Sequence, residues 1–165
     1  MANVICLGPT GSGKTLLIKK LQNVDAVDET STSVPTVGSN LFSIHYNNVV
    51  INIRELGGEV APLWPKYYDG IKKVIFVVDA SNLCQISAAG VLFYSVLADP
   101  RFKNAKVLLV LTKMDVSYRQ MRNEALLILQ MKRLQTEVPQ TITIIESSAI
   151  TGEGRDEILE WLIKK

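Results

Sequence analysis

Close to its beginning the chain carries the stretch Gly8-Pro9-Thr10-Gly11-Ser12-Gly13-Lys14-Thr15. It fits the pattern GxxxxGK(S/T), which lies between a strand and a helix in phosphate-binding loops. Glycines let successive backbone N–H groups turn inward around a phosphate, and the following helix points the positive end of its dipole at the same anion. Lys14 would neutralise phosphate oxygens, and the Thr15 hydroxyl would bind Mg²⁺. We therefore expect this stretch to bind the phosphates of a nucleotide.

Outside this loop, short β-branched runs alternate with longer segments of helical period. The runs VIFVVD and VLLVLT have no polar face, which is typical of strands covered by helices on both sides. Asn47 and Asn48 tolerate positive φ and predict an antiparallel hairpin. The sequence thus predicts one α/β domain over residues 1–165, with a six-stranded, mostly parallel sheet, one antiparallel edge strand and helices on both faces. The expected strands are Asn3–Leu7, Ser39–Tyr46, Val49–Arg54, Lys73–Asp79, Lys106–Thr112 and Thr141–Glu146, and the expected helices are Lys14–Asn23, Ser87–Ala98, Tyr118–Thr136 and Gly154–Lys164.

The composition argues against several classes of protein. Eighteen basic and sixteen acidic residues give a net charge of +2, which offers no reason to expect nucleic acid as a partner. One histidine all but excludes histidine-rich metal sites, and two cysteines within apolar runs argue against a disulfide framework. No apolar run approaches the roughly 18 residues that a membrane-spanning helix needs. We expect a cytoplasmic protein and a monomer.

A second motif indicates which base is bound. Residues 112–115 read TKMD and follow the apolar run VLLVL. Asp115 could accept hydrogen bonds from N1–H and N2–H₂ of guanine, a pair that adenine does not offer. The Lys113 stem could lie along the base, and the Ala149 N–H could donate to guanine O6. Either loop alone is often only a solvated turn, but the two in this order predict a guanine nucleotide. The expected base-side residues are Thr112, Lys113, Asp115, Ser148, Ala149 and Ile150.

These motifs resemble those of the small GTPases of the Ras superfamily, and within them the ADP-ribosylation factor-like (Arf-like) branch. Residues 34–38, VPTVG, are similar to the first switch of that branch, in which Thr36 would bind Mg²⁺ and sense the γ-phosphate. Residues 56–68 are similar to the second switch, with Gly58 at the γ-phosphate, and residues 54–58 most resemble one divergent member. Trp64 either packs the second switch onto the sheet or is exposed for a partner. The resemblance covers the whole chain and implies a P-loop NTPase (small G-protein) fold, GTP or GDP as ligand and Mg²⁺ as cofactor.

Two departures from the branch's pattern fall on the catalytic centre. In the branch an aspartate holds Mg²⁺ through a water. The resemblance gives the same water-mediated role to Glu55 of this chain, whose extra methylene changes the reach of the carboxylate. The branch has a catalytic glutamine, whereas this chain has Glu59, and an ionised glutamate accepts hydrogen bonds but donates none. The resemblance assigns catalysis to Glu59 with Lys14 and Gly58. We expect slow intrinsic GTP hydrolysis that needs an activator.

Two further departures concern the base and the partners. Thr112 stands where the NKxD motif has asparagine, and a hydroxyl makes fewer hydrogen bonds than an amide. We expect looser base binding, with selectivity kept by Asp115. Of the aromatic triad that many Arf-like proteins offer to effectors, only Tyr67 remains, and Ser39 and Arg54 stand at the other two positions. A partner set other than the usual one is expected.

The sequence leaves three functions open. The first is a guanine-nucleotide switch that regulates membrane or ciliary traffic, with a GTP-dependent effector, an exchange factor and a GTPase activator as partners. The second is a GTP-bound interaction module with little or no turnover, which Glu55 and Glu59 suggest. The third is a P-loop kinase for a small metabolite. Such kinases usually close arginines over the transferred phosphoryl group, whereas the arginines of this chain are scattered along the sequence and no lid insertion is visible.

The two ends of the sequence carry no expected lipid anchor. Ala2 rather than glycine follows the first methionine, which excludes N-myristoylation, and Lys164-Lys165 at the other end supplies no CaaX cysteine. The residues before Gly8 leave no room for the amphipathic helix that precedes the first strand of many relatives. We expect contact with membranes only through partners, either transiently or at the cilium.

Overall fold

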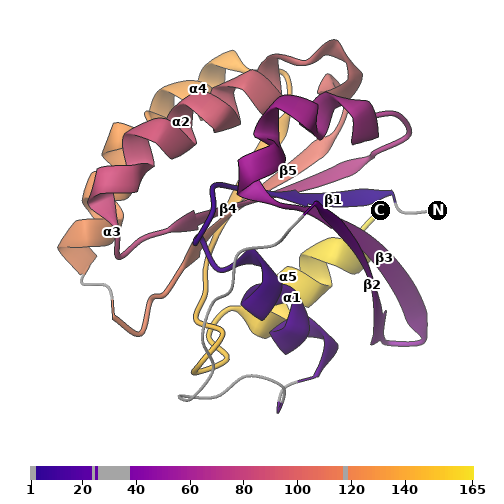
Figure 1. Cartoon of the computed structure of the whole chain (residues 1–165). Helices are drawn as coiled ribbons and strands as arrows, with labels where there is room; N and C mark the ends of the chain where they lie inside the picture. The colour runs from indigo at the N-terminus through magenta and orange to yellow at the C-terminus, as the bar shows by residue number, and fades with distance from the viewer. Residues whose placement is uncertain (1–2, 24, 26–37, 117–118) are drawn as a thin grey trace.

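A six-stranded sheet forms the centre of the molecule, in the order β2-β3-β1-β4-β5-β6 (Figure 1). The computed structural model describes residues 3–23, 25, 38–116 and 119–165. Every neighbouring pair of strands is parallel except β2 and β3. This arrangement confirms the predicted mostly parallel sheet with one antiparallel edge strand. The strands are β1 Val4–Leu7, β2 Ser39–Tyr46, β3 Val49–Leu56, β4 Lys73–Asp79, β5 Lys106–Thr112 and β6 Thr141–Glu146.

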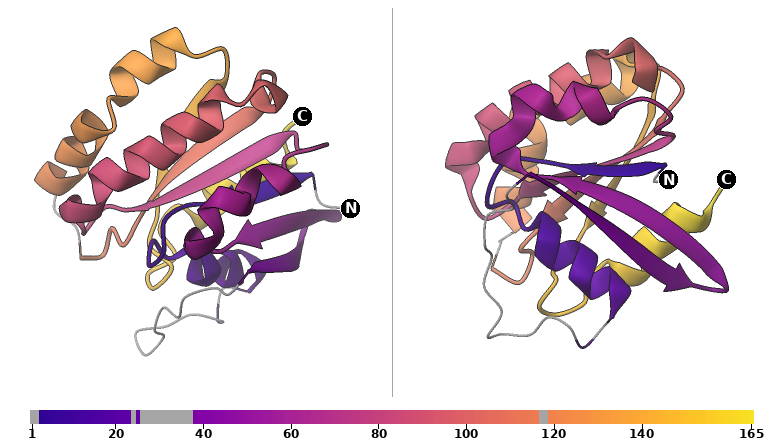
Figure 2. Two further views of the ribbon diagram at one scale, coloured as in Figure 1. Left: turned by 45° about the horizontal axis from the view of Figure 1, so that its top comes forward. Right: turned by 45° about the vertical axis from the view of Figure 1, so that its right-hand side comes forward.

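Helices cover both faces of the sheet, which explains why the central strands lack a polar face (Figure 2). In β4, Val74 and Phe76 pack into the core shared with α2, α3 and α4, whereas Ile75 and Val77 pack into the core shared with α1 and α5. Among the described residues, no helix has the length and apolar character needed to cross a bilayer. The helices are α1 Lys14–Gln22, α2 Leu83–Ala98, α3 Arg119–Ile128, α4 Met131–Glu137 and α5 Arg155–Ile163, with the 3-10 helices η1 Gly58–Tyr67 and η2 Pro100–Phe102.

The antiparallel hairpin forms where the asparagine pair predicts it. Asn47 and Asn48 have φ of 49° and 62°, and they connect β2 to β3 directly. The register pairs Tyr46 with Val49 next to the turn and runs without a shift to Ser39 opposite Leu56. β3 is therefore held by β2 on one side and by β1 on the other.

The single helix predicted over Tyr118–Thr136 is wrong, because the chain forms α3 and α4 with a break between them; the predicted start at Tyr118 lies outside the described residues. Gln130 takes a left-handed conformation at φ 55°. On a continuous helix, two residues two positions apart would point about 200° apart. The break lets both Leu129 and Met131 bury their side chains in the core beneath α2. No glycine or proline marks this position, so local sequence signals could not reveal it.

The 3-10 helix η1 settles the question left open at Trp64. Trp64 is buried, its Nε1–H donates to the Gly57 carbonyl at 3.0 Å, and its ring meets Phe76 edge to face at a centroid distance of 6.5 Å. Pro62 and Pro65 interrupt any α-helical pattern in this segment. Trp64 thus packs the segment onto the sheet and is not exposed for a partner.

Trp64→Phe is expected to lower the free energy of unfolding by about 1–3 kcal/mol, because the Gly57 carbonyl loses its buried donor. Urea denaturation would measure the change. Tyr67→Phe is the matched control, since this ring lies in the same 3-10 helix but is exposed, and it should change stability by less than about 0.5 kcal/mol. Equal midpoints for Trp64→Phe and wild type would show that the indole N–H contributes nothing to the fold.

Candidate nucleotide-binding site

The phosphate-binding loop joins β1 to α1 at the carboxyl ends of the parallel strands, where ligands bind in sheets of this kind. Lys14 is buried, and its Nζ donates to the carbonyls of Gly8 at 2.8 Å and Pro9 at 2.9 Å. Gly13 caps the helix at φ 94°, a conformation that disfavours a side chain. Burial lowers the pKa of Lys14, while the charge of Glu55 acts in the opposite direction. The loop thus encloses one cation at the start of a helix.

Two of the residues predicted to hold Mg²⁺, Thr15 directly and Glu55 through a water, lie in contact with each other. The Thr15 hydroxyl donates to Oε1 of Glu55 at 2.5 Å, and the Glu55 side chain is fully buried. Hydroxyl and carboxylate oxygens are ligands that Mg²⁺ accepts, usually together with phosphate oxygens of a substrate. Among the described residues, no group of three or more His, Cys, Asp or Glu gathers as a metal site. The donors at Thr15 and Glu55 therefore fit Mg²⁺ held jointly with a nucleotide. The third predicted ligand, Thr36, lies outside the described residues.

The start of η1 lies against the phosphate-binding loop. A β-carbon on Gly58 would lie 2.2 Å from the Thr10 backbone nitrogen, so the two backbones approach as only a glycine permits. The Gly57 N–H donates to the Gly38 carbonyl at 2.8 Å, which ties this segment to the end of the first switch. The side chain of Glu59 is exposed. Gly58 thus stands beside the loop that would hold phosphates, with Glu59 directly after it.

The loop after β5 and the loop after β6, which carry the predicted base-side residues, are in contact. Ser148 donates from its hydroxyl to Oδ1 of Asp115 at 2.8 Å, and the Met114 N–H donates to the Ser147 carbonyl at 3.1 Å. Ala149 and Ile150 follow, both half-buried. The loop after β5 and the loop after β6 therefore form one surface, with the Asp115 carboxylate held by a neighbouring hydroxyl.

Thr112 and Lys113 connect this base-side surface to the phosphate-binding loop. The Thr112 hydroxyl donates to the Ser12 carbonyl at 2.6 Å and lies 3.1 Å from the Val78 carbonyl, a second acceptor. Lys113 Nζ donates to the Gly11 carbonyl at 3.2 Å. The Thr112 hydroxyl, which replaces the amide of the NKxD motif, thus forms a hydrogen bond to the phosphate-binding loop.

Asp79 is a site residue that the sequence interpretation missed. It ends β4, is buried, and accepts from Lys113 Nζ at 2.7 Å through Oδ2. Its other oxygen accepts from the backbone and hydroxyl of Ser81. Asp79 therefore fixes the lysine whose stem would lie along the base. A carboxylate at the carboxyl end of an otherwise apolar strand was the available signal.

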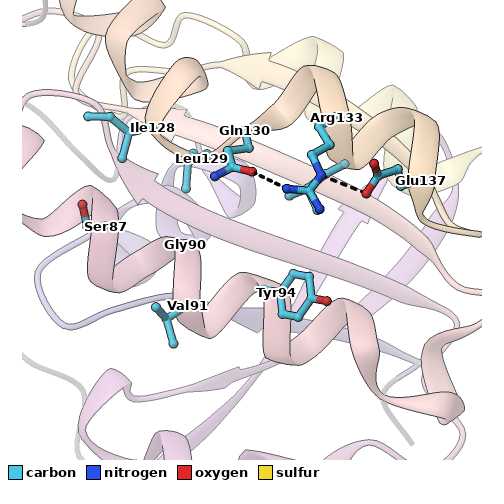
Figure 3. A pocket seen from close by; sticks show the side chains of 10 residues that line it. Ser87, Gly90, Val91, Tyr94, Ile128, Leu129, Gln130, Arg133 and Glu137 are labelled. Atoms are coloured by element: carbon cyan, nitrogen blue, oxygen red, sulfur yellow. Dashed lines mark hydrogen bonds and ion pairs between the residues drawn. The ribbon is translucent and has the colours of Figure 1, made fainter.

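A groove of about 500 Å³ lies between α2 and the α3–α4 pair (Figure 3). Val91, Tyr94 and Ile128 present exposed apolar surface there. On its other side Arg133 bonds to Gln130 and Glu137. No residue expected to bind nucleotide lines this groove, so it is separate from the nucleotide loops.

The known proteins that this chain resembles belong to one family. The model of the ADP-ribosylation factor family matches residues 1–165. ADP-ribosylation factor-like protein 16 of Homo sapiens is 37% identical over 164 residues, which cover 96% of this chain and 83% of that protein. ADP-ribosylation factor-like protein 1 of Saccharomyces cerevisiae is 33% identical over 162 residues, covering 97% and 85%.

Among solved structures, the Arl6 BBS3 small GTPase from Trypanosoma brucei with bound nucleotide analogue GppNp aligns with a TM-score of 0.82. It is 25% identical in sequence, and the match covers 98% of this chain and 94% of that chain. The P-loop fold and the resemblance to the Arf-like branch are therefore confirmed. The divergent member to which residues 54–58 point is ADP-ribosylation factor-like protein 16. This chain belongs to the ADP-ribosylation factor family and is a small GTPase, a GTP-binding switch protein.

Proposed function

We propose that this protein is a Mg²⁺-dependent guanine-nucleotide switch whose own GTP hydrolysis is slow and is accelerated by a separate activator protein. The observation that carries the proposal is the meeting of three elements at one edge of the sheet. Lys14 closes the phosphate-binding loop, Gly58 lies against that loop, and Asp115 is held at the base-side surface. This edge is where α/β sheets bind ligands.

The metal would be held by Thr15, Glu55 and, from the first switch, Thr36. Thr15 and Glu55 already place oxygens side by side, next to the loop that would hold the phosphates. When bound, Mg²⁺ neutralises charge that develops on the phosphate oxygens. The side chains around it position the nucleotide: Lys14 offers its ammonium, and the glycine-rich loop offers backbone N–H groups.

The switching element would be the pair of segments joined between Gly57 and Gly38. Their hydrogen bond links η1 to the end of the first switch, so a γ-phosphate contacted at Gly58 and Thr36 would order both together. A partner that recognises the ordered shape would bind the GTP form and leave after hydrolysis.

The surface next to these segments supports a partner set other than the usual one. The Arg54 guanidinium lies 5.3 Å from the centroid of the Tyr67 ring and donates to the Ser39 hydroxyl at 2.8 Å. The surface therefore presents a held cation on one ring instead of three aromatic rings. An effector of this chain would therefore meet that cation.

The cellular role we propose is regulation of membrane or ciliary traffic from the cytoplasm, as a monomer that reaches membranes through its partners. Its support is the similarity to Arf-like proteins across the chain. The alternative is a GTP-bound interaction module without useful turnover. Glu55 and Glu59, which replace the branch's aspartate and catalytic glutamine, favour this alternative.

Hydrolysis by the isolated protein is expected to be far slower than the roughly 1 s⁻¹ of efficient phosphoryl transfer. Glu59 is exposed, cannot donate a hydrogen bond to the phosphoryl oxygens, and repels them by its charge. Single-turnover hydrolysis at saturating Mg²⁺ measures the rate. Glu59→Gln should change it less than an added activator, for which a gain of roughly 10³–10⁵ is expected.

A cell extract supplies the activator in this assay, and Glu55→Asp tests the other altered position. Rapid turnover of the wild type alone would show that Glu59 is a competent catalytic residue. No turnover with any extract, in a protein that binds GTP tightly, would favour the interaction module.

A further inference from the structure

Glu55 is placed to contact the metal without a water between them. We propose that its carboxylate is a direct, inner-sphere ligand of Mg²⁺ beside Thr15, in place of the water-mediated contact that the branch's aspartate makes. The inference rests on the Mg²⁺-dependent nucleotide binding proposed above, and it concerns how the chain's own side chain meets the metal.

The distance between the two oxygens suits adjacent metal ligands. Oε1 of Glu55 lies 2.5 Å from the Thr15 hydroxyl. Mg²⁺ holds oxygen ligands at about 2.0–2.1 Å in near-octahedral geometry, so neighbouring ligands are about 2.9 Å apart. The two oxygens would need to move apart by only about 0.4 Å to occupy adjacent corners of one coordination shell.

The backbone gives the longer side chain no room to retreat. Glu55 lies in β3, between two neighbouring strands, and its backbone is in register with Cys6 of β1 and Asn40 of β2. An added methylene extends the carboxylate by about 1.5 Å relative to aspartate. Because β3 is held on both sides, the extra length must be accommodated by the side chain.

Burial leaves that side chain one direction. Glu55 is 0% exposed, so the carboxylate cannot turn out into solvent, and it reaches the hydroxyl that opens α1. A buried carboxylate is costly unless it is paired or coordinates a cation. The additional reach is thus directed at the Thr15 hydroxyl, itself a predicted Mg²⁺ ligand, and there the carboxylate would take the place of one water on the metal.

The first test counts the waters on Mn²⁺ bound in place of Mg²⁺ in the GDP complex, by line broadening of the Mn²⁺ EPR spectrum in ¹⁷O-enriched water. We expect one inner-sphere water fewer in the wild type than in Glu55→Asp, because the shorter side chain lets a water return. An equal water count in the two proteins would overturn the inference.

The second test needs no substitution at Glu55. In protein labelled with ¹³C at the glutamate carboxyl carbons, a directly bound carboxylate gives a resolved ¹³C coupling in the Mn²⁺ ENDOR spectrum. We expect that coupling in the wild type and in Glu157→Gln, the matched control that removes an exposed carboxylate on α5, away from the nucleotide loops. Bound Mn²⁺ without the coupling would overturn the inference alone. GDP bound with no Mn²⁺ signal would overturn the proposed metal role, and this inference with it.

Discussion

Asp115→Asn is expected to shift the base preference from guanine toward xanthine. Asp115 can accept from both guanine donors, and Ser148 holds its carboxylate in place at 2.8 Å. Asparagine would present an amide donor to one guanine donor, whereas xanthine offers an acceptor at that position. A bidentate base contact is worth about 1–3 kcal/mol, so GTP affinity should fall roughly 5- to 150-fold.

Competition binding with GTP and xanthosine triphosphate measures the shift. Asp156→Asn is the matched control, because it removes the same charge from an exposed position on α5 and should leave both affinities unchanged. Equal GTP affinity in Asp115→Asn and wild type would remove Asp115 from the base-binding site.

Gly58→Ala is expected to damage both the fold and nucleotide binding. The new β-carbon would lie 2.2 Å from the Thr10 nitrogen and 2.7 Å from the Pro9 carbonyl carbon, so η1 and the phosphate-binding loop would have to move apart. Overpacking of this kind costs about 1–3 kcal/mol. In a protein of this size that corresponds to a Tm lower by roughly 2–12 °C, and the displaced loop should also bind GTP more weakly.

Thermal unfolding and GTP titration of the same preparations test this expectation. Gly90→Ala is the control. Gly90 lies in α2, and its new β-carbon would meet only a flexible side-chain atom of Leu129, at 3.4 Å. Alanine is favoured over glycine in a helix by about 1 kcal/mol, so the control should be neutral or slightly stabilised. A Gly58→Ala protein with the Tm and GTP affinity of the wild type would contradict the close approach of the two segments.

The strands could be predicted from the sequence because their signal is local. The apolar runs of β4 and β5 begin and end at the predicted residues, and Asn47-Asn48 marks the hairpin through its own backbone preference. The break at Gln130 has no such signal, since its cause is the packing of neighbouring side chains under α2. The sequence did not reveal η1, which consists of two short helical pieces joined at a kink at Val60, because a 3-10 segment with two prolines lacks the 3.6-residue period.

In the candidate site, too, residues within one contiguous motif could be predicted from the sequence, whereas roles that depend on distant contacts could not. The phosphate-binding loop is contiguous, so its residues could be named from their spacing alone. The use of Thr112 could not, because its acceptor at Ser12 lies 100 positions away along the chain. The role of Asp79 could not be predicted either, because its contact with Lys113 depends on the parallel pairing of β4 with β5.

The contacts that Thr112 and Lys113 make with the phosphate-binding loop bear on how fast a nucleotide leaves. Their hydrogen bonds end on the carbonyls of Ser12 and Gly11, within the loop that would surround the phosphates. Moving the base-side loop outward would therefore also break hydrogen bonds that hold the phosphate-binding loop. Base and phosphates should then dissociate in one concerted opening rather than in two independent steps. The proposed exchange factor would then need to displace only one end of the nucleotide to release the whole of it.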